Sequence, residues 1–228
     1  IEDQEIRERF EKDLLLALWD RPQVILWLKR APRYLPYIEQ MLKDSGLPGD
    51  LKYMAVAESA LRPHAGSSRG AIGFWQFTPA TGRKYGLVID EYRDERRNVF
   101  AATVAAIRYL KQLYEDLGSW TLAAAAYNMG EEGLMAEMLA QGTHDYYRLY
   151  LPLETQRYIF RILSVKLILS DPLTYGFTLT EKETYPPLSF DRVEVDCPEE
   201  IPIRIVAEAG NTHFKAVKDL NPELRGHY

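Results

Sequence analysis

The segment 98–117 constrains the fold of this chain more than any other. Its apolar residues recur every three or four positions, as they do on one face of an α-helix, and Gly118 follows as a helix-ending residue. The stripe consists of Val99, Ala102, Thr103, Ala106, Ile107, Leu110, Leu113, Tyr114 and Leu117. The segment is therefore predicted to be a long amphipathic helix with one face in the core.

The same periodicity predicts helices on both sides of this segment. Three are expected before residue 50, over residues 8–19, 22–31 and 34–45, with Phe10, Leu14, Leu15 and Leu18 on the apolar face of the first and Gly46 as the C-cap of the third. Four more are expected over residues 79–86, 119–130, 131–142 and 152–169, with Thr78 and Ser119 as N-caps. The sequence up to residue 170 thus indicates a mainly α domain.

Composition excludes some classes of function. The 228 residues carry a net charge of −5, and no basic stripe indicates a nucleic-acid partner. The single cysteine, Cys197, excludes an internal disulfide. The charged opening IEDQEIRERF is no signal peptide, and no run approaches the roughly 20 apolar residues of a membrane span. A membrane anchor outside this chain stays open.

One acidic residue, Glu58, lies within an apolar helical run. The helix is expected to begin near Asp50 as its N-cap, with Leu51, Met54, Ala55 and then Glu58 along one face. Burial and the negative end of the helix dipole would both raise the pKa of this carboxyl group. A carboxyl group that is protonated near neutrality can donate a proton to a glycosidic oxygen. The alternative is a glutamate at a helix end that reaches solvent.

The segment that follows offers no second carboxylate. No Asp or Glu occurs between Ser59 and Ile89, whereas glycosidases usually place two carboxyl groups about 5–5.5 Å or about 6.5–9.5 Å apart. A distant residue such as Asp90, Glu91 or Glu154 has to supply the partner, or the nucleophile is water or the substrate itself.

The loop after Glu58 carries further candidate residues. Its glycines allow close backbone approach, Ser67 offers a hydroxyl group, and Gln76 can bind an amide such as an N-acetyl group. Trp75 and Phe77 either pack in the core, which is commoner, or form a platform for a sugar.

Two later segments end in polar or phenolic residues. Tyr127 and Asn128 lie at the end of the predicted helix 119–130, where they are local caps or ligand contacts. Tyr158 lies in the first turns of the last long helix, where it faces a cleft or fills the core.

Four of these pieces occur in one order: Glu58-Ser59, GAIGFWQF over residues 70–77, AAYNMG over residues 125–130, and ETQRY over residues 154–158. In this order and spacing they resemble the family 1 lytic transglycosylases, over roughly residues 10 to 170. The resemblance implies a lysozyme-like domain that cleaves the β-1,4 bond between N-acetylmuramic acid and N-acetylglucosamine in peptidoglycan. Phe74-Trp75 departs from the Leu-Met pair of many members.

The resemblance also implies roles for single residues. Glu58 matches the catalytic acid and base, which acts without a second carboxylate while the muramoyl 6-hydroxyl group closes on C1 to give a 1,6-anhydro product. The residues that match substrate-binding positions are Ser59, Ser67, Gln76, Tyr127, Asn128 and Tyr158, of which Ser67 is the looser match. No metal and no cofactor are expected.

The end of the chain differs in composition. Residues 171–192 contain Pro172, Pro186 and Pro187 and are expected to form a linker. Residues 193–228 include two short predicted helices, and RVEVDC at residues 192–197 is a candidate strand. This order is similar to a truncated LysM-type glycan-binding module, and a structural cap on the catalytic domain is an equal alternative.

The sequence therefore predicts a mainly α, lysozyme-like domain over residues 1–170, a linker, and a small α+β tail. The predicted function is lytic cleavage of peptidoglycan glycan strands by a periplasmic monomer, attached to the outer membrane in a longer protein. The alternatives are a hydrolytic muramidase, which needs a second carboxylate or a held water, and a non-catalytic peptidoglycan-binding scaffold, which has no use for Glu58.

Overall fold

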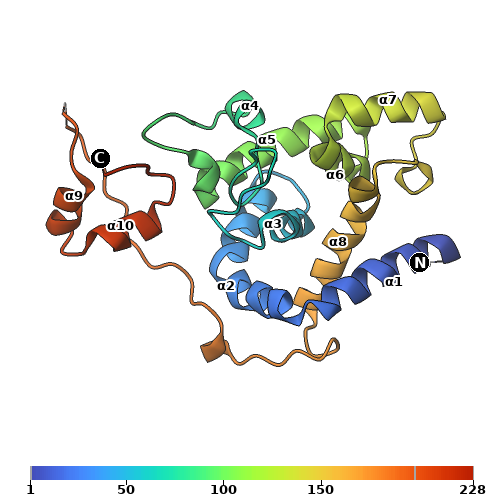
Figure 1. Cartoon of the computed structure of the whole chain (residues 1–228), viewed down its shortest axis with the longest axis horizontal. Coiled ribbons are helices and arrows are strands. Elements are labelled where there is room, and N and C mark those ends of the chain that lie inside the picture. Colours follow the sequence, from blue (N-terminus) through green and yellow to red (C-terminus); the bar gives the residue numbers. More distant parts are fainter. Residues whose placement is uncertain (1, 198, 228) are drawn as a thin grey trace.

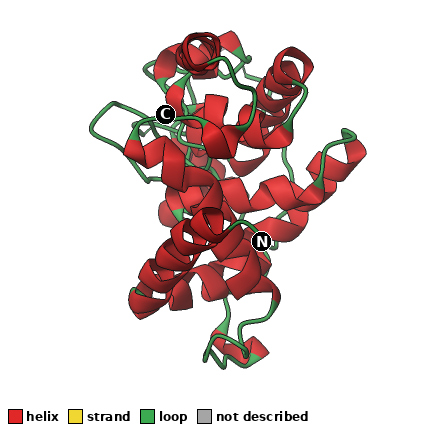
Figure 2. Ribbon diagram, turned by 90° about the vertical axis from the view of Figure 1, so that its right-hand side faces the viewer, coloured by secondary structure: helices red, strands yellow, loops and turns green. Residues whose placement is uncertain are grey.

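The computed structural model describes residues 2–197 and 199–227 and shows a mainly helical molecule (Figures 1 and 2). The predicted main domain begins at residue 1 and the predicted tail ends at residue 228, and both of these residues lie outside the described ranges. The helices are α1 (Gln4–Trp19), α2 (Arg21–Asp44), α3 (Lys52–Ser59), α4 (Pro79–Lys84), α5 (Val99–Leu117), α6 (Trp120–Met129), α7 (Glu131–Gln141), α8 (Leu153–Ser170), α9 (Ile203–Ala209) and α10 (Phe214–Leu220). Short 3-10 turns are η1 (Gly49–Leu51), η2 (Glu95–Arg97), η3 (Tyr146–Arg148) and η4 (Glu181–Glu183).

The short helix α3 lies in the middle of the domain, among α2, α5, α6 and α8 (Figure 1). Five of its eight residues are apolar and buried, and the largest fully buried side chains of the chain, Trp75 and Tyr158, belong to the same core. The alanines of α6 are buried as well, and their small side chains let this helix lie close to its neighbours. The core therefore surrounds the helix that carries Glu58.

Local capping signals predicted several helix ends correctly. The Thr78 side chain accepts a hydrogen bond from the Thr81 amide at the start of α4, and Ser119 does the same for Leu122 at the start of α6. Gly118 ends α5 in the left-handed conformation, with φ of 66°. These ends are fixed by chemistry within one turn of the helix.

The two helices expected over residues 22–31 and 34–45 are one continuous helix, α2, so that prediction is wrong. Pro32 and Pro36 lie inside α2, where each proline costs about 3 kcal/mol. Along the same helix Val24, Ile38 and Leu42 are fully buried, and each such side chain contributes about 1.5–3 kcal/mol. Tertiary packing thus offsets the two prolines. Gly46 follows the helix with φ of 76°, as its predicted cap.

The start of α3 and one residue of the apolar face of α1 also differ from prediction. Asp50 is not an N-cap, because it lies in η1 and its carboxylate pairs with Lys166 at 2.5 Å. In α1, Leu15 is 66% exposed, whereas Asp13 is buried and pairs with Arg157 of α8. The other three predicted residues do pack, because Phe10 lies against Phe160, and Leu14 and Leu18 pack against the core around Val24. The periodic pattern therefore located α1 and most of its packing face.

The described part of the tail is helical. The predicted α+β tail is therefore wrong with respect to its strand. Residues 192–197 form no strand in the described structure, while α9 and α10 occupy the two predicted helical segments. Backbone hydrogen bonds join the tail to the loop before α5, from the Asp94 amide to Glu223 O (2.8 Å) and from the Arg225 amide to Tyr92 O (2.7 Å). The tail therefore docks on the main domain, next to the loop between α4 and α5 (Figure 1).

Among the described residues, no helix combines the length and the apolar character needed to cross a membrane.

A buried ion pair holds this docking region together and gives a first prediction. Asp94 is fully buried and accepts two hydrogen bonds from Arg96, at 2.8 and 2.7 Å, and one from Arg225, at 2.9 Å. Asp94→Ala leaves the buried Arg96 charge without a carboxylate partner, although the bonds to Gly70 O and Phe77 O remain, so the free energy of unfolding should fall by about 3–5 kcal/mol.

Urea denaturation followed by circular dichroism measures this change. The matched control is Glu208→Ala, which breaks an exposed pair with Arg204 and should cost under about 1 kcal/mol. Equal losses in the two variants would contradict the importance of the Asp94 network.

Candidate active site

Glu58 lies in the last turn of α3, where the chain leaves the helix abruptly. Ala60 caps α3 in the left-handed conformation with φ of 53°, and Leu61 follows with φ of 58°. A non-glycine residue in this region carries backbone strain and persists only where its surroundings enforce it. The two residues turn the chain away from the helix axis and leave the half-buried Glu58 side chain at the edge of the core.

Tyr158 of α8 binds the carboxyl group of Glu58. Its hydroxyl group donates a hydrogen bond of 2.5 Å to Glu58 Oε1. Arg161, one turn further along α8, donates to the carbonyl oxygen of Ala57 at 2.9 Å. The packing of α3 against α8 therefore positions the acid from residues about a hundred positions later in the chain.

These surroundings set the protonation of Glu58. Burial raises the pKa of this carboxyl group, the hydrogen bond from Tyr158 and the positive charge of Arg161 lower it, and the charge of Glu154 raises it, which together give a pKa of about 7. Near neutral pH the group is therefore present both as acid and as carboxylate. This is the protonation behaviour of a group that donates a proton and then accepts one.

Gln76 lies in the loop facing α3 and supports the backbone of that loop. Its Nε2 donates to Ala65 O at 3.0 Å and to Gly73 O at 2.9 Å, and its own φ is 50°. These bonds use only the amide nitrogen, so the amide oxygen is available as an acceptor for a ligand.

Gly73 and Arg96 hold the same loop in place. A Cβ atom on Gly73, whose φ is +87°, would lie 1.8 Å from Arg96 O, so only glycine fits there. The Arg96 guanidinium group donates to Gly70 O at 3.0 Å and to Phe77 O at 3.1 Å. A loop with little regular structure is thus held at both ends by one buried side chain.

The two serines differ in position. Ser59 is buried, and its hydroxyl group lies 3.0 Å from Ala55 O and 2.8 Å from Phe74 O, so it joins α3 to the loop. Ser67 is exposed, and its hydroxyl group accepts from the Ala71 amide at 3.1 Å. Ser67 therefore lies on the loop surface, while Ser59 supports the site from inside the protein.

Tyr127 and Asn128, at the end of α6, bind to other elements rather than capping their own helix. The Tyr127 hydroxyl group donates to Trp75 O at 2.7 Å, and Asn128 Oδ1 accepts from Thr155 Oγ1 at 2.9 Å. Burial, followed by the negative charge of Glu58, raises the pKa of Tyr127 well above its ordinary value. The phenol therefore stays protonated beside the acid.

The predicted aromatic platform is absent at Trp75 and Phe77, which are 0% and 2% exposed. The Trp75 indole donates to Thr103 Oγ1 at 3.0 Å, and both rings pack against Tyr127. The core alternative for these two residues is therefore confirmed.

The three distant carboxylates all lie at exposed positions. Asp90 accepts from the amides of Tyr92 and Arg93 in the loop where the tail docks, and Glu91 is exposed beside it. Glu154 is exposed in the first turn of α8, and among these three it alone affects the pKa of Glu58. Among the described residues, no cluster of three or more His, Cys, Asp and Glu side chains could hold a metal ion.

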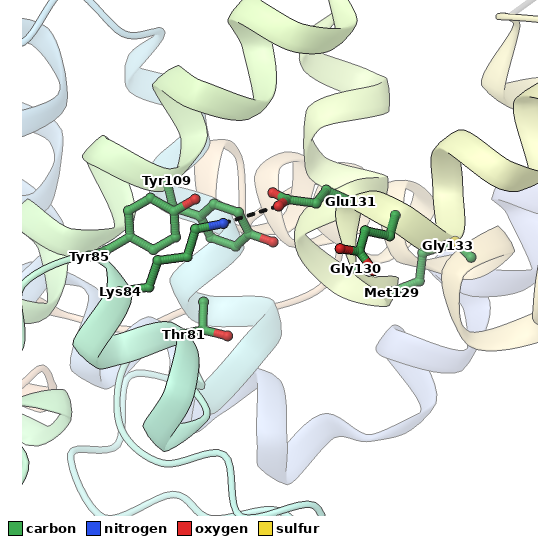
Figure 3. A pocket seen from close by; sticks show the side chains of 9 residues that line it. Thr81, Lys84, Tyr85, Tyr109, Met129, Gly130, Glu131 and Gly133 are labelled. Atoms are coloured by element: carbon green, nitrogen blue, oxygen red, sulfur yellow. Dashed lines mark hydrogen bonds and ion pairs between the residues drawn. The ribbon is translucent and has the colours of Figure 1, made fainter.

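A pocket of about 310 Å³ lies between α4 and the start of α7 (Figure 3). The Tyr85 ring stacks on Tyr109 with centroids 4.6 Å apart, and Tyr109 lies 5.1 Å from Tyr127. Lys84 Nζ and Glu131 Oε1 form an ion pair of 3.1 Å across this pocket. A continuous set of tyrosines therefore connects the pocket with the surroundings of Glu58.

Sequence reasoning did not find Arg161, Thr155 or Arg96. Arg161 lies one helical turn after Tyr158, so the helical period could have indicated that it shares a face with that residue. Nothing in the local sequence distinguishes Arg96 from its neighbours Arg93 and Arg97.

Comparison with known proteins shows the family of this chain. The profile of the Transglycosylase SLT domain family matches residues 36–149, and the chain belongs to this family. It is similar to membrane-bound lytic murein transglycosylase D of Escherichia coli (strain K12), with 34% identity over 202 residues, which are 86% of this chain and 44% of that protein. The chain thus spans less than half the length of this relative.

Other similarities are shorter or weaker. A putative tributyltin chloride resistance protein from Alteromonas sp. (strain M-1) is 36% identical over 110 residues, which are 47% of this chain and 53% of that protein. Peptidoglycan transglycosylase gp16 of Escherichia phage T7 is 41% identical over 83 residues, 36% of this chain and 6% of that protein. The solved structure of an inactive mutant of lytic transglycosylase Slt from Pseudomonas aeruginosa aligns with 66% of this chain and 26% of its own, at 22% identity and a TM-score of 0.44. That structural similarity is too weak to assign the fold.

The hydrogen bond from Tyr158 gives a prediction about pH dependence. This bond favours the ionised form of Glu58, so Tyr158→Phe raises the pKa of Glu58 above its value of about 7. If protonated Glu58 is the acid, kcat/KM falls as pH rises through that pKa. The falling limb should therefore move to higher pH in Tyr158→Phe.

The measurement is the pH profile of peptidoglycan solubilisation. Tyr109→Phe serves as control, because it removes another buried phenolic hydroxyl group from the core around Tyr127 and should leave the limb in place. A limb that stays at the wild-type pH in Tyr158→Phe would show that this bond does not tune the acid.

Proposed function

We propose that this chain is the catalytic part of a lytic transglycosylase with a lysozyme-like domain, and that Glu58 acts alone as acid and base. The observation that supports this most strongly is the half-buried Glu58, held by the Tyr158 hydroxyl group and with a pKa of about 7. Membership of the SLT transglycosylase family supports peptidoglycan as the substrate. The bond cleaved is the β-1,4 linkage between N-acetylmuramic acid and N-acetylglucosamine.

The proposed reaction has two proton transfers at one carboxyl group. Protonated Glu58 donates its proton to the glycosidic oxygen as the bond to C1 breaks. The resulting carboxylate then removes the proton from the muramoyl 6-hydroxyl group, whose oxygen bonds to C1. The positive charge of Arg161 and the hydrogen bond of Tyr158 favour the carboxylate of Glu58 between the two steps.

The nucleophile follows from the missing partner carboxylate. Asp90 is bound by the amides of its own loop, and Glu91 and Glu154 are exposed, so we propose that none of the three activates a water across the sugar ring as an inverting hydrolase requires. The 6-hydroxyl group belongs to the reacting sugar, so its attack gains effective concentration over water. These two points favour lytic cleavage over the hydrolytic muramidase.

The remaining predicted residues are proposed to line the groove around this acid. The Gln76 amide oxygen suits an N-acetyl N–H group, and Ser67 lies on the exposed face of the same loop. Tyr127, Asn128 and Tyr158 are proposed to form the facing wall, while Ser59 acts on the substrate through the loop that it supports. The pocket beside Tyr109 is proposed to extend the groove for further sugars.

The setting of the enzyme and its tail are proposals as well. The membrane-bound relative suggests a location in the cell envelope, for which we propose the periplasm, attached to the outer membrane through parts outside this chain, with the chain acting as a monomer. For the tail we propose the structural cap instead of the LysM-type module, because Arg225 and Glu223 bind the Asp94 loop. The domain limits at 170 and 192 remain those expected from the sequence.

Glu58→Gln tests the assignment of the acid. Glutamine keeps the size of the side chain but cannot donate a proton as an acid, so solubilisation of purified sacculi should fall by at least the 10²–10⁴-fold that is typical of general acid–base catalysis. The fold should survive: the pKa of Glu58 is raised when folded, so its stabilising contribution is present at low pH and lost as pH rises through about 7.

The control for folding follows from this pH dependence of stability. At pH 8 the uncharged Glu58→Gln variant should melt no lower than the wild type, because wild-type Glu58 is then ionised in its buried position. A folded variant that keeps most of its activity would refute the assignment.

The products distinguish the lytic reaction from hydrolysis. Digestion of sacculi in water enriched in heavy oxygen should give strands that end in 1,6-anhydro-N-acetylmuramic acid, without heavy label at that end, because no water adds to C1. Mass spectrometry of the fragments measures this. Reducing ends that carry the heavy label would instead show a hydrolase, with Glu154 as the first carboxylate to substitute.

A further inference from the structure

A second pocket, of about 330 Å³, is lined in part by the segment that follows Glu58. Its walls come from α2, from the loop around Arg62 and from Tyr185 of the linker, and they include Arg30, Arg33 and Leu61. We call it the basic pocket, because three guanidinium groups, those of Arg30, Arg33 and Arg62, line it. It shares no residue with the pocket of Figure 3.

The three arginines bind backbone carbonyl groups and no carboxylate. Arg30 Nη1 donates to Ala60 O at 3.1 Å, Arg62 Nε to Ser59 O at 3.1 Å, and Arg33 Nε to Pro186 O at 3.0 Å. No ion pair within the described ranges includes any of the three. Each bond uses one N–H group of a planar fork that has five, so several donors remain for a ligand.

Such a cluster is unusual in a chain of net charge −5. Burial, followed by the positive charge of Arg62, lowers the pKa of Arg30, which shows that the two cations repel each other in a partly desolvated place. Arg33 lies over the Tyr185 ring at 5.2 Å, so the linker holds it in position. A bound anion would relieve the repulsion and use the free donors.

The position of the basic pocket connects it to the site of Glu58. Arg62 and Arg30 bind the carbonyl groups of Ser59 and Ala60, which are the two residues directly after the acid. Ala65 also lines the basic pocket, and its carbonyl oxygen accepts from Gln76. The basic pocket and the surroundings of Glu58 therefore share the segment 59–65.

We propose that the basic pocket binds a carboxylate of the peptide stem that peptidoglycan carries on N-acetylmuramic acid. This inference rests on the proposed function, which brings a glycan strand to Glu58. The guanidinium fork matches the planar carboxylate in two parallel hydrogen bonds, and Tyr34 and Leu61 supply an apolar wall for the aliphatic part of the stem. The enzyme would then distinguish strands that carry stems from strands that have lost them.

Direct binding tests this with the Glu58→Gln protein, so that no turnover interferes. Calorimetry compares one tetrasaccharide of N-acetylglucosamine and N-acetylmuramic acid in three forms: with peptide stems, with stems whose carboxylates are converted to amides, and without stems. The free carboxylates should increase affinity about tenfold or more over both other forms. Adding Arg33→Gln should remove most of that advantage, whereas adding Arg204→Gln, the same loss of charge in the tail, should keep it.

The outcomes separate this inference from the proposed activity. Equal affinity for the three forms would overturn the stem site even if the wild type cleaves sacculi. So would a carboxylate advantage that Arg33→Gln leaves intact, or inorganic phosphate that binds the basic pocket without competing with the stem-bearing ligand. A wild type that cleaves neither stem-bearing nor stem-free strands, while binding still depends on Arg33, would refute the activity and keep the site. The comparison of carboxylate and amide stems needs only the Glu58→Gln protein, whose folding is checked by its melting, and does not depend on an arginine variant.

Discussion

The buried pair of Asp94 and Arg96 is the interaction on which the rest of the structure depends. Arg96 binds Asp94 through two nitrogens and, with its remaining one, the carbonyl oxygens of Gly70 and Phe77. Burying two charges is costly unless every polar atom finds a partner, and here the partners are the backbone of the loop 70–77 and Arg225 of the tail. One ion pair thus holds together three segments that are far apart in the chain.

Strain is concentrated around the same loop. Ala60, Leu61 and Gln76 are three of the four non-glycine residues with positive φ among the described residues, and they flank Glu58 on both sides of the loop. Each such residue costs of the order of 1–3 kcal/mol and persists only where surrounding contacts enforce it. The enforcing contacts are visible: Arg30 binds Ala60 O, and Gln76 binds Ala65 and Gly73. The loop is therefore held in a shape that its own sequence disfavours, as is typical of functional sites.

The sequence was sufficient wherever the determining chemistry is local. The ends of α4, α5 and α6 follow from Thr78, Gly118 and Ser119, each of which acts within one turn. The position of Glu58 at the end of an apolar helix follows from the periodicity of four residues before it. These effects act over a few residues, so the residues that cause them can be identified in a single sequence.

Contacts between distant segments could not be predicted in this way. The continuity of α2 through Pro32 and Pro36 depends on what its buried face meets, and the missing strand at residues 192–197 depends on a partner strand that the tail does not provide. The same holds for the site: only the family resemblance assigned Tyr158 to it, and Arg161 and Arg96 were not found. Their roles arise from the packing of α8 and η2 against segments that precede them by tens of residues.

The protonation of Glu58 shows how these two levels combine. Position at the end of an apolar helix supplies the burial that raises its pKa, and this part is already encoded in α3. The opposing contributions, from the Tyr158 hydroxyl group and the Arg161 charge, both come from α8 and bring the pKa back to about 7. Burial alone would hold the carboxyl group of Glu58 in its protonated form. That form can donate a proton, but too little carboxylate would then be present to act as the base in the second step. Because both opposing groups lie on one face of α8, the docking of this helix on α3 sets the balance between the two forms that the proposed reaction uses in turn.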